Sequence, residues 1–169
     1  MIDPQAVPLS LYIHLPWCTR KCPYCDFNSH EGFTESLQQP YIDALLADLD
    51  SQQTWWRDRP IESIFIGGGT PSLFEGRWLG TLLEGVSNRV TLSRHVEITL
   101  ESNPGSAEST RFAEYRAAGV NRLSIGVQSF NDRALHALGR IHSGSEARRA
   151  LDMVATAGFQ RWNIDLMHG

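Results

Sequence analysis

The chain has 169 residues, enough for one domain with a substantial core, and its hydrophobic content of 41% is ordinary for a globular protein. Its net charge of −4, without a basic block, argues against a nucleic-acid surface, so we expect no nucleic-acid partner. No apolar run approaches the roughly 18 residues of a membrane span, and the first residues do not resemble a signal peptide. We therefore expect a cytoplasmic protein that is not integral to a membrane.

The first predicted strand, residues 9–15, leads into a loop that contains every cysteine of the chain. The three cysteines are spaced C-x3-C-x2-C: Cys18, Cys22 and Cys25. Three bare thiolates so close together would repel one another, which indicates a shared metal centre. Zinc would need a fourth ligand, for which His14 or His30 is the candidate. An iron–sulfur cube held by three cysteines leaves one iron open to an outside ligand, and this is the interpretation we favour.

A helix is expected from Pro40 to Leu49, followed by a second strand over 61–66. This strand runs into residues 67–71, Gly-Gly-Gly-Thr-Pro. Consecutive glycines let a ligand approach the backbone closely, although a tight strand-to-helix turn is the alternative. The next helix is expected over 73–86.

The third predicted strand, 96–100, ends at Glu101 and Asn103, where an acid can accept hydrogen bonds from an amine or a ribose hydroxyl. A fourth strand over 123–127 runs into Gln128, and a fifth over 159–166 contains Asp165. The remaining helices are expected at 107–118, 132–138 and 145–157, with Arg140 between the last two.

Alternating strands and helices predict an α/β fold with five parallel strands and outer helices. In such folds ligands bind beyond the carboxyl ends of the strands. The cysteines, the glycines, Glu101 with Asn103, and Gln128 follow the ends of strands one to four, and Asp165 lies near the end of strand five. We therefore expect them to lie along one rim of the sheet.

The cysteine spacing, with Tyr24 directly before the third cysteine, resembles the cluster motif of the radical S-adenosylmethionine (SAM) superfamily. The longer stretch 11–30, LYIHLPWC to CDFNSH, resembles the HemN-like group, which includes coproporphyrinogen III dehydrogenases and haem chaperones of the HemW type. The dehydrogenases carry another cysteine two residues after the third. Phe27 occupies that position here, which is the pattern of the chaperones.

The resemblance implies a partial (β/α)6 TIM-like radical SAM barrel. Residues 1–169 are expected to form its incomplete core domain, truncated after strand five. It further implies a 4Fe-4S cluster on the three cysteines, with SAM on the open iron and a 5′-deoxyadenosyl radical released on reduction. The positions that match cofactor contacts of the group are Tyr12, Tyr24, Gly68, Gly69, Thr70, Glu101, Asn103, Gln128, Arg140 and Asp165. No catalytic residue is assigned.

Three functions remain open at this point. A haem chaperone would bind haem or another tetrapyrrole in the longer protein and deliver it to a respiratory acceptor protein. An oxygen-independent coproporphyrinogen III dehydrogenase would instead decarboxylate its substrate oxidatively in porphyrin biosynthesis. A zinc-stabilised binding module would do neither. Phe27 favours the first function over the second, and the glycine and acid positions disfavour the third.

Overall fold

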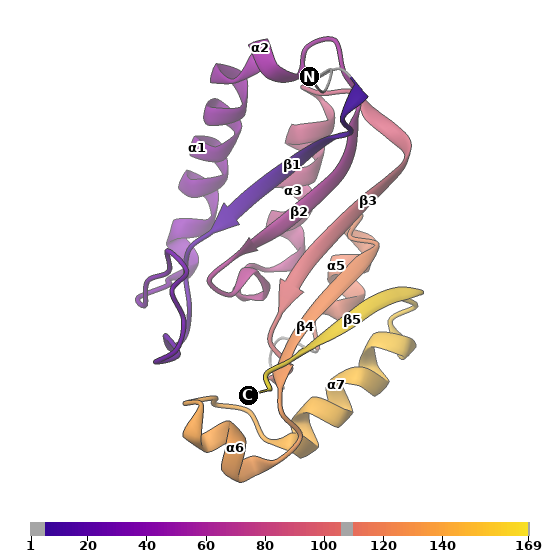
Figure 1. The fold of residues 1–169 in the computed structure, drawn as a ribbon. Helices are drawn as coiled ribbons and strands as arrows, with labels where there is room; N and C mark the ends of the chain where they lie inside the picture. Colours follow the sequence, from indigo (N-terminus) through magenta and orange to yellow (C-terminus); the bar gives the residue numbers. More distant parts are fainter. Residues whose placement is uncertain (1–5, 106–109, 169) are drawn as a thin grey trace.

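The computed structural model describes residues 6–105 and 110–168. Five strands form one parallel sheet in sequence order, which confirms the predicted α/β architecture (Figure 1). The strands are β1 (Leu9–Leu15), β2 (Ile61–Gly68), β3 (Leu92–Ser102), β4 (Arg122–Gln128) and β5 (Arg161–Leu166). Since consecutive strands are neighbours and all run the same way, their carboxyl ends meet at one rim.

Helices connect the strands and most of them lie on one face of the sheet, whereas the helix over residues 132–137 lies beyond the carboxyl end of β4 (Figure 1). They are α1 (Gln38–Ser51), α2 (Gln53–Trp56), α3 (Gly76–Ser87), α5 (Phe112–Ala117), α6 (Asp132–Ala137) and α7 (Gly144–Thr156). Short 3-10 turns precede two of them, η2 (Glu35–Leu37) and η3 (Pro71–Leu73).

Several predicted helix boundaries differ from the observed ones. Helix α1 begins two residues before Pro40, and α3 begins at Gly76 because η3 first occupies 71–73. Of the helix predicted over 107–118, residues 107–109 lie outside the described residues, and the described helix begins at Phe112. Within the part of the chain that the structure describes, no helix is long and apolar enough to cross a membrane.

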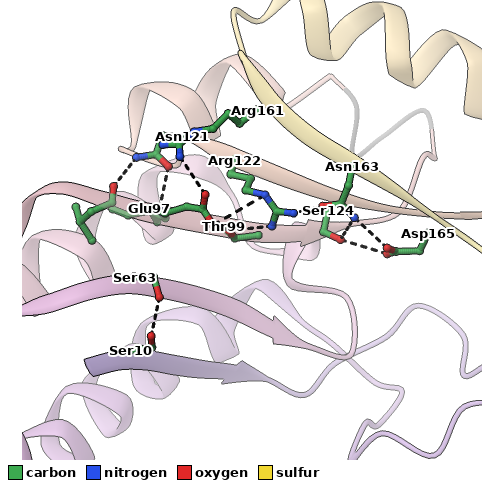
Figure 2. Close-up of polar contacts among 12 residues, drawn as sticks. Ser10, Ser63, Glu97, Thr99, Asn121, Arg122, Ser124, Arg161, Asn163 and Asp165 are labelled. Atoms are coloured by element: carbon green, nitrogen blue, oxygen red, sulfur yellow. Dashed lines mark hydrogen bonds and ion pairs between the residues drawn. The ribbon is translucent and has the colours of Figure 1, made fainter. Parts of the chain in front are cut away.

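The sheet has one apolar and one polar face, because residues alternate along each strand. On the helix side, the central strands bury Ile64, Ile66, Ile98, Leu100, Leu123 and Ile125, each at most 7% exposed. These side chains pack with Ile42 of α1, Leu79 and Leu82 of α3, and Tyr115 of α5. The opposite side, here called the inner face, carries serines, Arg122, Asn163 and carboxylates (Figure 2).

Candidate functional site

A cavity lies at the carboxyl ends of the strands and collects residues from widely separated parts of the sequence. Of the predicted site residues, those that line it are Cys18, Cys22, Cys25, Tyr24, Gly69, Thr70, Glu101, Asn103, Gln128, Arg140 and Asp165. Tyr12 and Gly68 do not line it, although each lies next to Glu101. The structure thus brings together at one rim what the sequence places after five different strands.

The cysteine loop is closed at its base by backbone pairing between Trp17 and His30. The Cys18 N–H donates to the His30 carbonyl at 2.8 Å, and the His30 N–H donates to the Pro16 carbonyl at 2.7 Å. All three thiols are free, with Cys18 buried and the other two half-buried. The loop therefore holds three unpaired sulfurs at the wall of the cavity.

The three sulfurs lie on one loop and line one cavity, which fits a cluster held by three cysteines. Among the described residues, no three or more His, Cys, Asp or Glu side chains converge closely enough to hold one metal ion. A cube does not require that convergence, because each cysteine binds a different iron. The two candidate fourth ligands for zinc, His14 and His30, do not line the cavity.

His14 is instead engaged in holding the loop. Its Nδ1 lies 2.9 Å from the Tyr12 hydroxyl, and its Nε2 lies 2.8 Å from the Asn28 carbonyl. The imidazole therefore ties β1 to the far end of the cysteine loop. His30 has an exposed side chain and contributes through its backbone.

The glycine loop after β2 packs against the segment that leads to the cysteines. A Cβ on Gly69 would lie 2.6 Å from the Trp17 carbonyl oxygen, and one on Gly68 would lie 2.7 Å from that of Leu15. Gly68 also has a φ of +125°, which side-chain-bearing residues rarely adopt. The lack of a side chain at Gly68 and Gly69 therefore allows two segments of the protein backbone to pack closely together.

The N–H groups of this loop are already used inside the protein. Gly68 donates to the Glu101 carboxylate at 3.1 Å, Gly69 to the Leu15 carbonyl at 2.9 Å, and Thr70 to the Trp17 carbonyl at 2.7 Å. What the loop can offer a ligand is therefore carbonyl oxygen and the Thr70 hydroxyl. Acceptors of this kind suit a cationic amine.

Glu101 is the next-to-last residue of β3 and lies beside this loop. Burial raises the pKa of its carboxyl, and the nearby Asp165 raises that pKa further, while the hydrogen bond from the Gly68 N–H opposes both effects. Tyr12 lies on the inner face below, with its side chain 57% exposed. Burial of part of its ring, together with Glu101, raises the Tyr12 pKa.

Arg140 joins the cysteine loop to the ends of the central strands. Its Nη2 donates to Asn103 Oδ1 at 2.6 Å and to the Gly126 carbonyl at 2.7 Å, while Nη1 lies 3.5 Å from the Cys22 sulfur. Asn103 in turn donates to the Thr70 hydroxyl at 3.1 Å. The Arg140 Nε is buried and has no hydrogen-bond partner among the described residues.

Tyr24 stands at the same place, between the second and third cysteines. Partial burial raises the pKa of its hydroxyl; the Arg140 charge opposes that shift, and Cys22 adds to it. Gln128, at the end of β4, has a φ of +65°. A non-glycine residue in the left-handed region is strained, and such strain is concentrated at functional sites.

Seven residues that line the cavity are not among the predicted site residues: Arg20, Lys21, Phe27, Pro71 and Ser102, and two on the inner face, Ser124 and Gly126. Both lie on β4, where the polar or small residues Arg122, Ser124, Gly126 and Gln128 alternate with buried apolar ones. The apolar residues of this alternation identify the buried face of β4, and the polar or small residues between them could have identified the cavity wall.

The comparison with family models decides the class of the protein. The model of the radical SAM superfamily matches residues 12–169, which include the cysteine loop and all five strand ends. The chain belongs to the radical SAM superfamily. This family implies SAM and a 4Fe-4S cluster, and the site fits both groups through three free thiols on one loop and a rim of acceptors.

Within the radical SAM superfamily, similar proteins include the heme chaperone HemW of Escherichia coli (strain K12), 53% identical over 162 residues. That match covers 96% of this chain but 43% of the relative. The mitochondrial radical S-adenosyl methionine domain-containing protein 1 of Mus musculus is 41% identical, with 95% of this chain and 36% of the relative covered. The chain thus spans well under half the length of these relatives.

The fold has a solved counterpart in the coproporphyrinogen III oxidase HemN of Escherichia coli, a radical SAM enzyme. The two superpose with a TM-score of 0.85 at 29% sequence identity, over 96% of this chain and 37% of that one. The match supports the interpretation of the five-stranded sheet as part of a radical SAM barrel.

Proposed function

We propose that residues 1–169 form the cluster- and SAM-binding core domain of a haem chaperone of the HemW type. The observation that carries the proposal is the cavity in which three free thiols face the polar ends of β2 to β5. Cys18, Cys22 and Cys25 would bind three irons of a 4Fe-4S cluster. When bound, the cluster and SAM together supply one-electron reductive chemistry.

The chain's own residues would hold and orient SAM. The acceptors around Gly68, Gly69 and Thr70, together with the Glu101 carboxylate, suit its ammonium group. Arg140, whose guanidinium charge lies at the cavity wall, suits its carboxylate. Asp165 and Gln128 suit its hydroxyl groups, and Tyr12, Tyr24 and Asn103 complete the surroundings.

The chaperone function is supported by the 53% identity to a relative named heme chaperone HemW. It is also supported by Phe27, which lines the cavity two residues after Cys25, where the dehydrogenases carry another cysteine. Haem, or another tetrapyrrole, would bind with residues of the longer protein, which would deliver it in the cytoplasm to a respiratory acceptor. The second candidate is coproporphyrinogen III dehydrogenase, favoured by the superposition on HemN.

The test uses the protein with its complete reading frame, reconstituted with iron and sulfide without oxygen. We expect about four irons per chain, as in a cubane cluster, SAM binding measured by calorimetry, and a haem spectrum on titration with haem. A Phe27→Cys variant tests whether that position separates the two functions. Uptake of one zinc in place of iron, or decarboxylation of coproporphyrinogen III by the unaltered protein, would contradict the proposal.

A further inference from the structure

Polar side chains on the inner face form a connected set of hydrogen bonds that ends at the cofactor rim (Figure 2). Asp165, at the rim, accepts from Ser124 at 3.2 Å and from Asn163 at 3.0 Å, one donor for each carboxylate oxygen. Asn163 also donates to the Ser124 hydroxyl at 3.0 Å. Ser124 and Asn163 are register partners on β4 and β5, so the strand pairing itself brings them together.

Every donor in this set has its direction fixed. Arg122 has only donors, and its Nη2 meets Asn163 Oδ1, so the amide must turn its oxygen toward the guanidinium. The two hydrogens of Asn163 Nδ2 are then directed at Ser124 and Asp165. Because the Ser124 oxygen already accepts from Asn163, its own hydrogen is free to donate to Asp165.

Arg122 is held in turn by two residues of β3. Its Nη1 donates to the Thr99 hydroxyl at 3.3 Å, and its Nε lies 3.9 Å from the Glu97 carboxylate. Arg161 binds the other oxygen of Glu97 at 3.1 Å. The guanidinium that orients Asn163 is therefore fixed from the side away from the rim.

We propose that Ser124 and Asn163 are positioning residues that hold the Asp165 carboxylate in one orientation at the cofactor cavity. The inference rests on the proposed function, in which Asp165 contacts SAM. Asp165 is exposed, and an exposed carboxylate held by nothing would occupy several rotamers. Two donors below it leave the outward lone pairs of both oxygens aimed at a ligand. Binding then does not have to fix this side chain.

The test measures the dissociation constant of SAM by calorimetry on cluster-reconstituted protein with its complete reading frame. Ser124→Ala is expected to weaken binding roughly tenfold, the size of one hydrogen bond to a charged group. Asn163→Ala should weaken it by a similar factor, and iron content should stay unchanged in both. The matched control is Ser63→Ala, since Ser63 lies on the same inner face and its hydroxyl donates to the Ser10 hydroxyl, at 2.8 Å, far from Asp165 in the sheet (Figure 2).

A double mutant separates positioning from a general structural effect. If Ser124 acts through Asp165, then Ser124→Ala should change the SAM affinity of an Asp165→Ala protein by less than about twofold. An equally large loss in both backgrounds, or a Ser124→Ala effect no larger than that of Ser63→Ala, would overturn the inference while leaving the proposed function intact. Failure of the unaltered, iron-loaded protein to bind SAM would overturn both.

Discussion

Arg140 connects the cysteine loop to Asn103 and Gly126, and its replacement gives a quantitative test of that connection. Arg140→Met keeps an unbranched apolar side chain but removes the guanidinium. It deletes the bonds from Nη2 to Asn103 at 2.6 Å and to the Gly126 carbonyl at 2.7 Å, and the longer contact to the Cys22 sulfur. The cysteine loop then loses its side-chain link to the ends of β3 and β4.

The magnitude follows from those contacts. Each hydrogen bond from a charged donor contributes roughly 1.5–3 kcal/mol, and the lower value applies here because the side chain is half-exposed. Two such bonds give a loss of about 3 kcal/mol in the free energy of unfolding. In a domain of this size each kcal/mol lowers Tm by roughly 2–4 °C, so the expected drop is about 6–12 °C.

The assay is thermal unfolding of the metal-free protein followed by circular dichroism, with iron retention after desalting as a second measurement. Arg77→Met is the control, because Arg77 binds Glu75 at 2.8 Å but its side chain is 69% exposed. A surface pair of that kind contributes about 0–1 kcal/mol. If the two variants unfold at the same temperature and retain iron equally, Arg140 is only a solvated charge and the reasoning is refuted.

Three further changes have defined outcomes. Glu101→Gln should bind SAM more weakly. Because burial and Asp165 raise the Glu101 pKa, the SAM affinity of the unaltered protein should fall at a higher pH on acidification than it would with an ordinary carboxyl. Calorimetry at several pH values should show this loss in the unaltered protein and not in the variant. Burial and the Arg140 charge lower the pKa of His142, so below about pH 6.5 this residue gains a proton on unfolding. Urea midpoints should therefore fall as pH drops below about 6.5, and His142→Gln should flatten that slope; an unchanged slope would contradict it. Gly69→Ala should displace the Trp17 carbonyl and reduce iron retention, whereas Gly80→Ala, whose nearest neighbour would be 3.8 Å away, should leave iron bound.

Much of the rim could be predicted because it depends on two local signals. Alternating apolar residues locate the strands, and parallel strands bring their carboxyl ends together. Glu101 and Asp165 could therefore be assigned to one cavity without knowledge of any distance. Strand ends were less predictable: β3 begins at Leu92, four residues before its expected start, because Leu92 pairs with Ile61 and a register shift accommodates the polar residues between that pair and the next one, Ser63 with Glu97.

Other features required the tertiary structure. Nothing near Arg140 in the sequence indicates that its loop returns to the cysteines, where Gly139, at a φ of +71°, approaches Pro23. The glycine run in the sequence indicates close approach by a ligand, whereas in the structure the nearest neighbours of Gly68 and Gly69 are the backbones of Leu15 and Trp17. For that reason Gly68→Val is expected to disturb the cysteine loop as well as the ligand site.

The partners of Asp165 show why core and site cannot be separated in this fold. Ser124 pairs in register with Glu101 of β3 on one side and with Asn163 of β5 on the other. A slip of one residue in β4 would turn Ser124 toward the helices and Leu123 toward the cavity. Leu123 is fully buried under the helices, so the hydrophobic effect opposes that slip. Packing of the apolar face of β4 in the core therefore fixes the register of the strand. That register places the Ser124 hydroxyl next to the Asp165 carboxylate at the rim.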